Sequence, residues 1–382
     1  MRPLQMVDTR RQYQKIKEEV NAAVLAVLES SQFIGGTVLN EFAQNLALYN
    51  GVKHVIPCAN GTDALQIAMM ALDLQPGDEI ITPSFTYIAT VEAAALLKLQ
   101  PVFVEVNQQT FCMDPSAVEK AITPKTKAIV PVHLYGHAAE MEKIMAIAHQ
   151  HQLYVIEDNA QAIGCDYHFS NGSTAKTGSI GHIGCTSFYP SKNLGAYGDG
   201  GAIFTNDDAL SVRLKMIAAH GQSERYYHDV VGCNSRLDTI QAAILGIKLI
   251  HLDEYNAARI KAATYYDSAF SGNPAIIVPF RASYSSHVFH QYTLVLADVG
   301  GTGKNRDGLS QFLADNGVPS MIYYPVPCHK QKMFDSVGGS SFNLPVTDWL
   351  SERVISLPIH TELDEEQQDI IIKNVLDYIN SN

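Results

Sequence analysis

Between residues 54 and 206 the chain alternates short apolar runs with stretches of helical periodicity. Four runs predict buried strands, at 79–83, 101–106, 127–133 and 153–157. Helical stretches separate them, at 62–73, 87–98, 114–122 and 140–151. Such alternation predicts right-handed βαβ units and a largely parallel sheet covered on both faces. Ligands of these sheets bind beyond the carboxyl ends of the strands, so the residues that follow each run are the candidates for a functional site.

The rest of the chain predicts further elements on both sides of this core. An amphipathic opening helix is expected over 12–30, strands over 185–190 and 200–206, and helices over 207–219, 237–252 and 254–270. A turn-rich stretch at 271–287 indicates a domain boundary. Beyond it we expect strands at 288–297 and 318–325 and helices at 305–316 and 364–380. The predicted architecture is α/β, with a large domain over 1–270 and a smaller α+β domain over 271–382.

The charge of the chain excludes one large class of partner. Its 27 Lys and Arg against 39 Asp and Glu give a net charge of −12, without a long basic block. Nucleic-acid binding needs clustered Lys and Arg, so it is not expected. No stretch has the roughly 18 apolar residues of a membrane helix, and we expect a cytoplasmic protein without membrane contact. The charged fraction of 17% is low, which favours a chain that hides surface in an oligomer.

A glycine turn before the first predicted helix of the alternating region is the first candidate site. Gly61 allows the backbone to approach a ligand, Thr62 supplies a hydroxyl, and the N-terminus of the helix favours a phosphate. The alternative is an ordinary helix cap formed by Thr62 or Asp63. The glycine-rich segment at 300–304 also resembles a phosphate loop, but it lacks the required spacing, and a flexible turn is expected there.

Two charged residues follow other predicted strands. Asp158 comes directly after the run at 153–157, where a carboxylate points toward the ligand crevice; a helix N-cap is its alternative role. Lys192 follows the strand at 185–190 and precedes four glycines in seven residues. Most lysines are solvated, but one packed among such residues is a candidate for a desolvated amine that forms a Schiff base. A phosphate anchor, a carboxylate for a pyridine nitrogen and such an amine are the minimum set for pyridoxal 5′-phosphate (PLP).

No metal site is expected. His133 and His137 lie four residues apart, but no HExxH signature surrounds them. We therefore expect both histidines in core or turn positions.

Seven segments resemble one enzyme family. They are NGTDAL (60–65), PSFTYIAT (83–90), VHLYG (132–136), EDNAQAIG (157–164), TSFYPSKNLGAYGDGGAIFTN (186–206), HGQ (220–222) and NSRLDTIQAAIL (234–245). Over nearly its whole length the chain resembles the DegT-type sugar-nucleotide aminotransferases, a branch of the fold-type I PLP enzymes. Within that family it is most similar to 3-aminotransferases of UDP-linked 3-oxo sugars, such as UDP-2-acetamido-2-deoxy-3-oxo-glucuronate.

The resemblance implies roles for individual residues. Lys192 would bind PLP covalently and transfer protons, and Asp158 would pair with the pyridinium nitrogen. Gln161 would lie near the ring hydroxyl, and Tyr87 would stack on the ring. The residues that match phosphate ligands are Gly61, Thr62, Ser187 and, from the other subunit of a homodimer, Asn234.

Three residues are expected at the substrate. Arg236 resembles a cross-subunit residue that would add positive charge for an anionic substrate; a helix cap or an interface ion pair is its alternative role. Tyr323 and Tyr324 stand where relatives often carry His-Tyr, a departure that leaves the exact sugar open.

The resemblance implies a reaction as well. We expect amino transfer from L-glutamate to a keto group of a nucleotide-linked sugar, for amino-sugar and surface-polysaccharide biosynthesis. A dTDP-keto-sugar 3- or 4-aminotransferase, a PLP-dependent lyase or dehydratase, and a non-catalytic PLP-binding or ligand-binding regulatory protein are the alternatives. A side branch of the family that dehydrates carries histidine at the lysine position, so Lys192 favours transamination.

Overall fold

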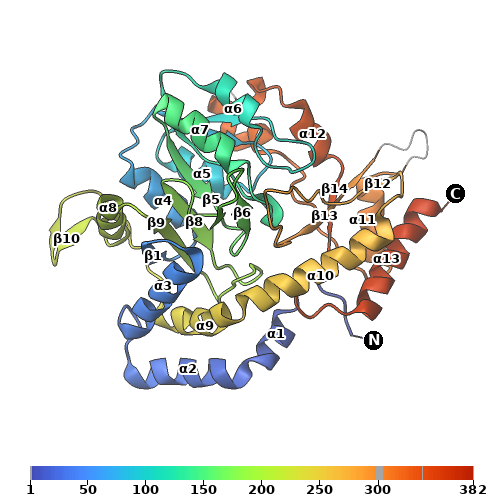
Figure 1. The fold of residues 1–382 in the computed structure, drawn as a ribbon, viewed down its shortest axis with the longest axis horizontal. Helices are drawn as coiled ribbons and strands as arrows, with labels where there is room; N and C mark the ends of the chain where they lie inside the picture. The colour runs from blue at the N-terminus through green and yellow to red at the C-terminus, as the bar shows by residue number, and fades with distance from the viewer. Residues whose placement is uncertain (1, 298–303, 338, 382) are drawn as a thin grey trace.

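The computed structural model describes residues 2–297, 304–337 and 339–381 (Figure 1). Most of the glycine-rich segment expected as a turn, 300–303, lies outside these residues. A seven-stranded sheet in the order β1-β9-β8-β5-β4-β2-β3 forms the centre of the molecule. Its strands are β1 (His54–Cys58), β2 (Glu79–Pro83), β3 (Gln100–Val104), β4 (Thr126–Ile129), β5 (Tyr154–Asp158), β8 (Ile183–Ser187) and β9 (Gly201–Thr205). The pairs from β3 to β8 are parallel and β9 is antiparallel to both neighbours, which confirms the largely parallel sheet.

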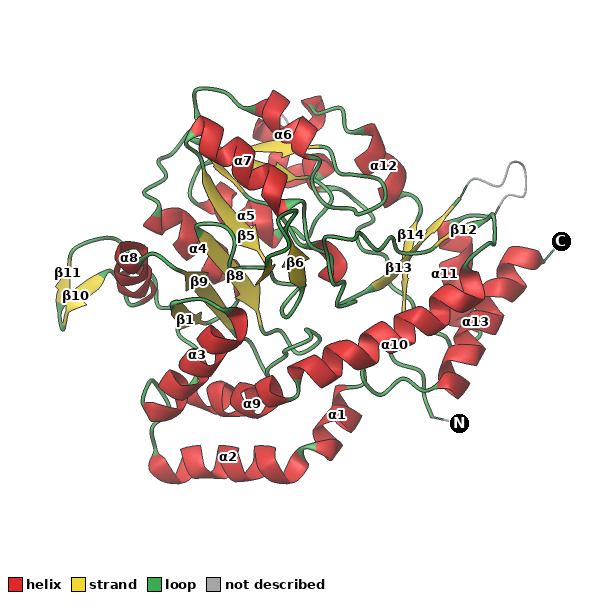
Figure 2. Cartoon of the chain, viewed as in Figure 1, coloured by secondary structure: helices red, strands yellow, loops and turns green. Residues whose placement is uncertain are grey.

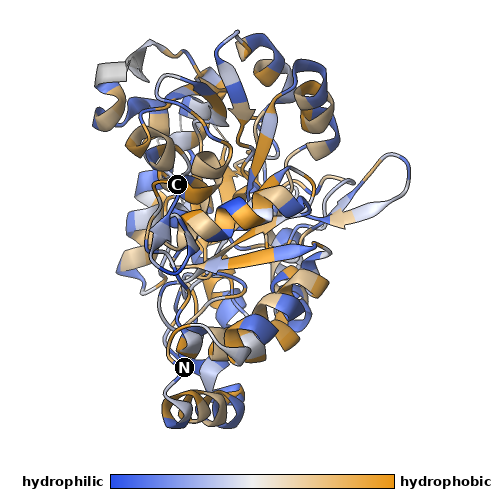
Figure 3. Cartoon of the chain, turned by 90° about the vertical axis from the view of Figure 1, so that its left-hand side faces the viewer, coloured by the Kyte–Doolittle hydropathy of each residue, from blue (hydrophilic) through white to orange (hydrophobic). Residues whose placement is uncertain are grey.

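Helices cover both faces of this sheet (Figure 2). They are α4 (Gly61–Ala71), α5 (Ala89–Leu96), α6 (Pro115–Ala121), α7 (Met141–His151) and α8 (Asp208–Ala218). Successive strand residues point to opposite faces, so Ile80 lies in the core under α4, α5 and α8, while Ile81 lies in the core under α6 and α7. The strands are accordingly apolar inside the molecule, and the outer helices are mixed (Figure 3).

The N-terminal segment forms helices that pack on α9. They are α1 (Thr9–Lys15), α2 (Lys17–Ser30) and α3 (Thr37–Asn50), beside α9 (Thr239–Ile250) and α10 (Leu252–Phe270). The expectation of a single helix over 12–30 is wrong, because the helix is interrupted at Ile16 and divided into α1 and α2. At the break Ile16 is buried with Val20 against Ile244 of α9, a tertiary contact that the local pattern does not encode.

A second, antiparallel sheet lies in the C-terminal part, built from β12 (Ile276–Ile277), β13 (Tyr292–Leu296) and β14 (Val354–Leu357). The strand expected at 318–325 is wrong: only Met321 bridges β14 there, and two prolines in that run lack the N–H that a ladder needs. The helices of this part are α11 (Arg306–Asp315), α12 (Pro345–Ser351) and α13 (Glu365–Asn380).

The apolar residues of the C-terminal part belong to two different cores. One contains β13, β14, α11, α13 and the second half of α10. Leu350 of α12, by contrast, lies in the core of the large sheet. The division at residue 271 stays a prediction. Two small hairpins complete the fold: β6 (Asp166–His168) with β7 (Thr174–Lys176), and β10 (Gln222–Glu224) with β11 (Tyr227–His228). None of the helices in the described ranges is long and apolar enough to cross a membrane.

Candidate functional site

The start of α4 and the end of β8 meet at the carboxyl edge of the sheet. Gly201 of β9 pairs with Cys58 on one side and with Ser187 on the other. A Cβ atom placed on Gly61 would lie only 2.8 Å from the Cβ of Ser187. Glycine is therefore needed for the two elements to approach so closely.

The first turn of α4 presents free amide groups at this point. Its cap is Asn60, whose side chain accepts a hydrogen bond of 2.8 Å from the N–H of Asp63. The alternative of Thr62 or Asp63 as the cap residue is therefore wrong. The N–H groups of Gly61 and Thr62 have no acceptor among the described residues. Unpaired N–H groups and the positive end of the helix dipole make this corner suitable for a phosphate.

Asp158 ends β5 and is 6% exposed. Its Oδ2 accepts a hydrogen bond of 2.7 Å from the hydroxyl of Thr90, and its Oδ1 accepts one of 3.1 Å from the N–H of Ala160. Turns and not a helix follow it, so the N-cap alternative is wrong. The carboxylate is thus fixed in orientation. Thr90 was missed from the sequence, because a threonine gives no local signal of a partner 68 residues away.

Lys192 lies in the loop between β8 and β9 and is partly buried. Burial lowers the pKa of Lys192 to about 8, against an upward effect of the Asp158 charge. The two groups predicted to act together therefore lie within electrostatic reach of each other. Nothing in the described ranges accepts a hydrogen bond from the Lys192 amine. A free amine with a pKa near neutrality is a competent nucleophile.

Gln161 joins the expected Tyr324 to Tyr135, a residue that the sequence did not single out. Its Nε2 donates to the hydroxyl of Tyr324 at 3.0 Å, and its Oε1 accepts from the N–H of Tyr135 at 2.8 Å. The ring of Tyr87, which is 56% exposed, lies 6.1 Å from the ring of Tyr324. The carbonyl of Tyr323 accepts a hydrogen bond from the Tyr135 hydroxyl. Burial raises the pKa of Tyr324, so its hydroxyl stays protonated.

Asn234 and Arg236 flank Ser235 in the segment that leads into α9. Both are exposed, whereas Ser235 between them is buried and its Oγ accepts a hydrogen bond of 3.0 Å from the N–H of Ala59. This alternation is that of an extended segment. Arg236 forms no ion pair with any residue in the described ranges, and the residue that caps α9 is Asp238. An interface ion pair stays its alternative role. Neither the side chain of Asn234 nor that of Arg236 forms a hydrogen bond or an ion pair with a predicted site residue of its own chain.

The histidine pair belongs to the core, as expected. His133 and His137 are both buried, and His133 Nε2 lies 2.8 Å from a carboxylate oxygen of Glu157. No cluster of three potential metal ligands occurs among the residues that the structure describes. The buried Glu157 also accepts hydrogen bonds from three main-chain N–H groups, of Gly178, Ile180 and Gly181.

Comparison with known proteins places these residues in a family context. The model of the DegT/DnrJ/EryC1/StrS aminotransferase family matches residues 14–376. The chain is 44% identical to a UDP-2-acetamido-2-deoxy-3-oxo-D-glucuronate aminotransferase of Pseudomonas aeruginosa, over 96% of this chain and 98% of the relative. It is 43% identical to a "Pleiotropic regulatory protein" of Geobacillus stearothermophilus, over 98% of both. The crystal structure of S. venezuelae DesV in complex with a ketimine intermediate superposes with a TM-score of 0.94 at 37% identity and covers 100% of both chains.

Proposed function

Because the chain belongs to the DegT/DnrJ/EryC1/StrS aminotransferase family, we propose that it transfers an amino group to the keto carbon of a nucleotide-linked sugar, with PLP as cofactor. The observation that carries this proposal is the Lys192 amine, with its lowered pKa, within reach of the buried Asp158. The expected fold-type I architecture, with its largely parallel sheet, is confirmed.

The described residues fit the cofactor. The corner between Gly61, Thr62 and Ser187 offers amide groups and hydroxyls to a phosphate, and a Cβ at Gly61 would fill it. Asp158, held by Thr90 and Ala160, offers a fixed carboxylate to a protonated ring nitrogen. When bound, PLP withdraws electrons from the carbon that loses its proton.

Lys192 and the residues around it supply the remaining chemistry. Its amine would hold the cofactor, and its Nζ, once free, would accept and return the proton of the substrate carbon. Gln161 is held between Tyr135 and Tyr324, and a fixed amide suits the predicted role near the ring hydroxyl. Tyr87 provides an exposed aromatic face for stacking on the ring.

We infer that the substrate is a UDP-linked 3-oxo sugar and that L-glutamate is the donor. The relative from Pseudomonas aeruginosa, whose name specifies a UDP-linked 3-oxo sugar, supports the first point. Arg236 is an exposed cation free of intrachain ion pairs with described residues, which suits an anionic substrate. Because neither Arg236 nor Asn234 bonds to a predicted site residue of its own chain, we propose a homodimer in which each completes the site of the partner.

One comparison favours a second function. The relative from Geobacillus stearothermophilus bears the name of a regulatory protein. A regulatory protein on this scaffold could bind PLP without turnover, so cofactor binding alone does not separate the two functions.

Two measurements test the proposal. Borohydride reduction of the PLP-loaded protein followed by peptide mass mapping is expected to place the cofactor on Lys192, and Lys176→Ala serves as a control that keeps this label. In a separate sample that has not been reduced, added glutamate is expected to yield one 2-oxoglutarate per site, which a lyase or dehydratase would not do. A Lys192→Ala protein with full turnover would refute the assignment.

A further inference from the structure

The loop that carries Lys192 is folded tightly on itself. The N–H of Ala196 donates to the carbonyl of Phe188 at 2.7 Å, and the N–H of Lys192 donates to the carbonyl of Tyr189 at 2.8 Å. A Cβ on Gly195 would clash with the carbonyl of Pro190. Gly195 and Lys192, three residues apart, therefore belong to the same compact turn.

A second lysine lies under this loop. Lys248 projects from α9, is 1% exposed, and donates a hydrogen bond of 2.5 Å to the carbonyl of Gly195. Its ammonium also lies 5.0 Å from the centre of the Tyr197 ring, on its face. No carboxylate among the described residues pairs with it. A carbonyl and an aromatic face are therefore its partners.

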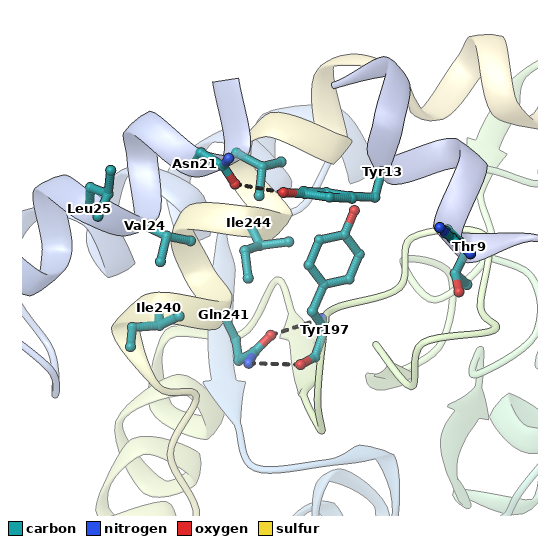
Figure 4. A pocket seen from close by; sticks show the side chains of 11 residues that line it. Thr9, Tyr13, Asn21, Val24, Leu25, Tyr197, Ile240, Gln241 and Ile244 are labelled. Carbon is teal, nitrogen blue, oxygen red and sulfur yellow. Dashed lines mark hydrogen bonds between the residues drawn. The ribbon is translucent and has the colours of Figure 1, made fainter. Parts of the chain in front are cut away.

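A second side chain of α9, that of Gln241, binds the loop at Tyr197, two residues after Gly195. Gln241 Oε1 accepts from the N–H of Tyr197 at 2.9 Å, and Gln241 Nε2 donates to the Tyr197 carbonyl at 3.3 Å (Figure 4). Side chains of α9 thus bind the main chain of the loop at both Gly195 and Tyr197.

A buried ammonium without a carboxylate is costly to keep. Burial, together with the smaller effect of the nearby Arg259 charge, lowers the pKa of Lys248 to about 8. A methionine of similar length would fill the space without this cost. The group that this buried ammonium binds is a main-chain carbonyl of the loop that carries Lys192. We take this to indicate that Lys248 holds the loop in place.

We propose that Lys248 is a positioning residue whose ammonium clamps the Gly195 carbonyl and thereby fixes Lys192 in its reactive place. The part of this inference that concerns catalysis rests on the proposed aminotransferase function. The clamp itself is a property of the loop and does not depend on the substrate.

The test compares Lys248→Met with a chemically matched control, Lys304→Met. The Lys304 ammonium also binds main-chain carbonyls, of Tyr378 and Ile379, and lies over the Tyr378 ring, but at the end of α13. Hydrogen exchange of the peptide spanning 188–201 is measured in the full-length protein, together with the rate at which added PLP becomes trapped on Lys192 by borohydride.

For Lys248→Met we expect exchange of the Lys192 and Ala196 amides to rise about tenfold and kcat to fall about tenfold, while KM for the nucleotide sugar changes little. Lys304→Met is expected to leave all of these unchanged. Lys248→Arg, which keeps the charge, should restore part of the protection; Lys248→Gln, which keeps a donor, replaces the methionine variant if that does not fold.

Unchanged exchange of 188–201 in folded Lys248→Met or Lys248→Gln would overturn the clamp, even in an active wild-type enzyme. Conversely, a wild-type protein without a borohydride-reducible chromophore would refute the proposed function. The hydrogen-exchange comparison would then still test whether Lys248 holds the loop.

Discussion

The corner between α4 and β8 offers a sharp test, because one methyl group separates the native geometry from a clash. In Gly61→Ala the new Cβ would lie 2.8 Å from the Cβ and 3.4 Å from the Cα of Ser187. Carbon atoms in contact lie about 3.5–4.0 Å apart, so the start of α4 has to move about 1 Å away from β8. Overpacking of this kind costs about 1–3 kcal/mol. If that movement separates the phosphate ligands, the dissociation constant of PLP should rise about 5- to 150-fold.

The assay is a titration of cofactor-free protein with PLP, followed by the absorbance of the bound cofactor. Gly246→Ala in α9 is the matched control, because its Cβ would meet no atom within 4 Å. That variant should bind PLP like the wild type and unfold at a slightly higher temperature, since alanine is favoured over glycine inside a helix by about 0.5–1 kcal/mol. Wild-type PLP affinity in Gly61→Ala would refute the reasoning.

Three further predictions concern the site. The rate at which cofactor-free protein binds PLP covalently should rise with pH and have its midpoint at about pH 8, because burial lowers the pKa of Lys192. Asp158→Asn should move this midpoint down, because the carboxylate raises that pKa. A midpoint measured by stopped flow near the ordinary value of 10.5 would contradict this prediction. Thr90→Val removes the 2.7 Å hydrogen bond to Asp158; it should lower kcat about tenfold and stability by about 1–3 kcal/mol, because a buried carboxylate oxygen loses its donor, whereas an unchanged kcat would show that Thr90 does not orient the carboxylate. Mixing inactive Lys192→Ala with inactive Arg236→Ala should restore activity, because a mixed dimer holds one site with both native residues; no recovery after subunit exchange would mean that Arg236 serves its own subunit.

Local patterns in the sequence predict the part of the fold that places the site. The strands that end at Asp158 and Ser187, and the helix that begins at Gly61, all lie within a few residues of their expected positions. The break at Ile16 could not be predicted, since it depends on a contact with α9. The strands beside the site could therefore be predicted from local patterns, whereas the break at Ile16 depends on a residue far away in the sequence.

The same distinction separates the site residues that were predicted from those that were missed. Lys192, Asp158 and Gly61 stand next to strand ends and glycine turns, which are visible in sequence. Thr90 and Lys248 act through partners 68 and 53 residues away. Nothing in their own neighbourhoods distinguishes them from ordinary helix residues, so only the folded chain reveals their contacts.

The proposed reaction is tested most directly by one two-step measurement on the PLP-loaded enzyme. Excess L-glutamate should convert the cofactor to its amino form with one 2-oxoglutarate released per site. After glutamate is removed, a UDP-linked 3-oxo sugar should restore the original absorbance and yield the 3-amino sugar nucleotide, faster than a dTDP-linked 3- or 4-oxo sugar does. A cofactor that glutamate leaves unchanged, or an amino form that no keto sugar nucleotide reconverts, would contradict the proposed aminotransferase function.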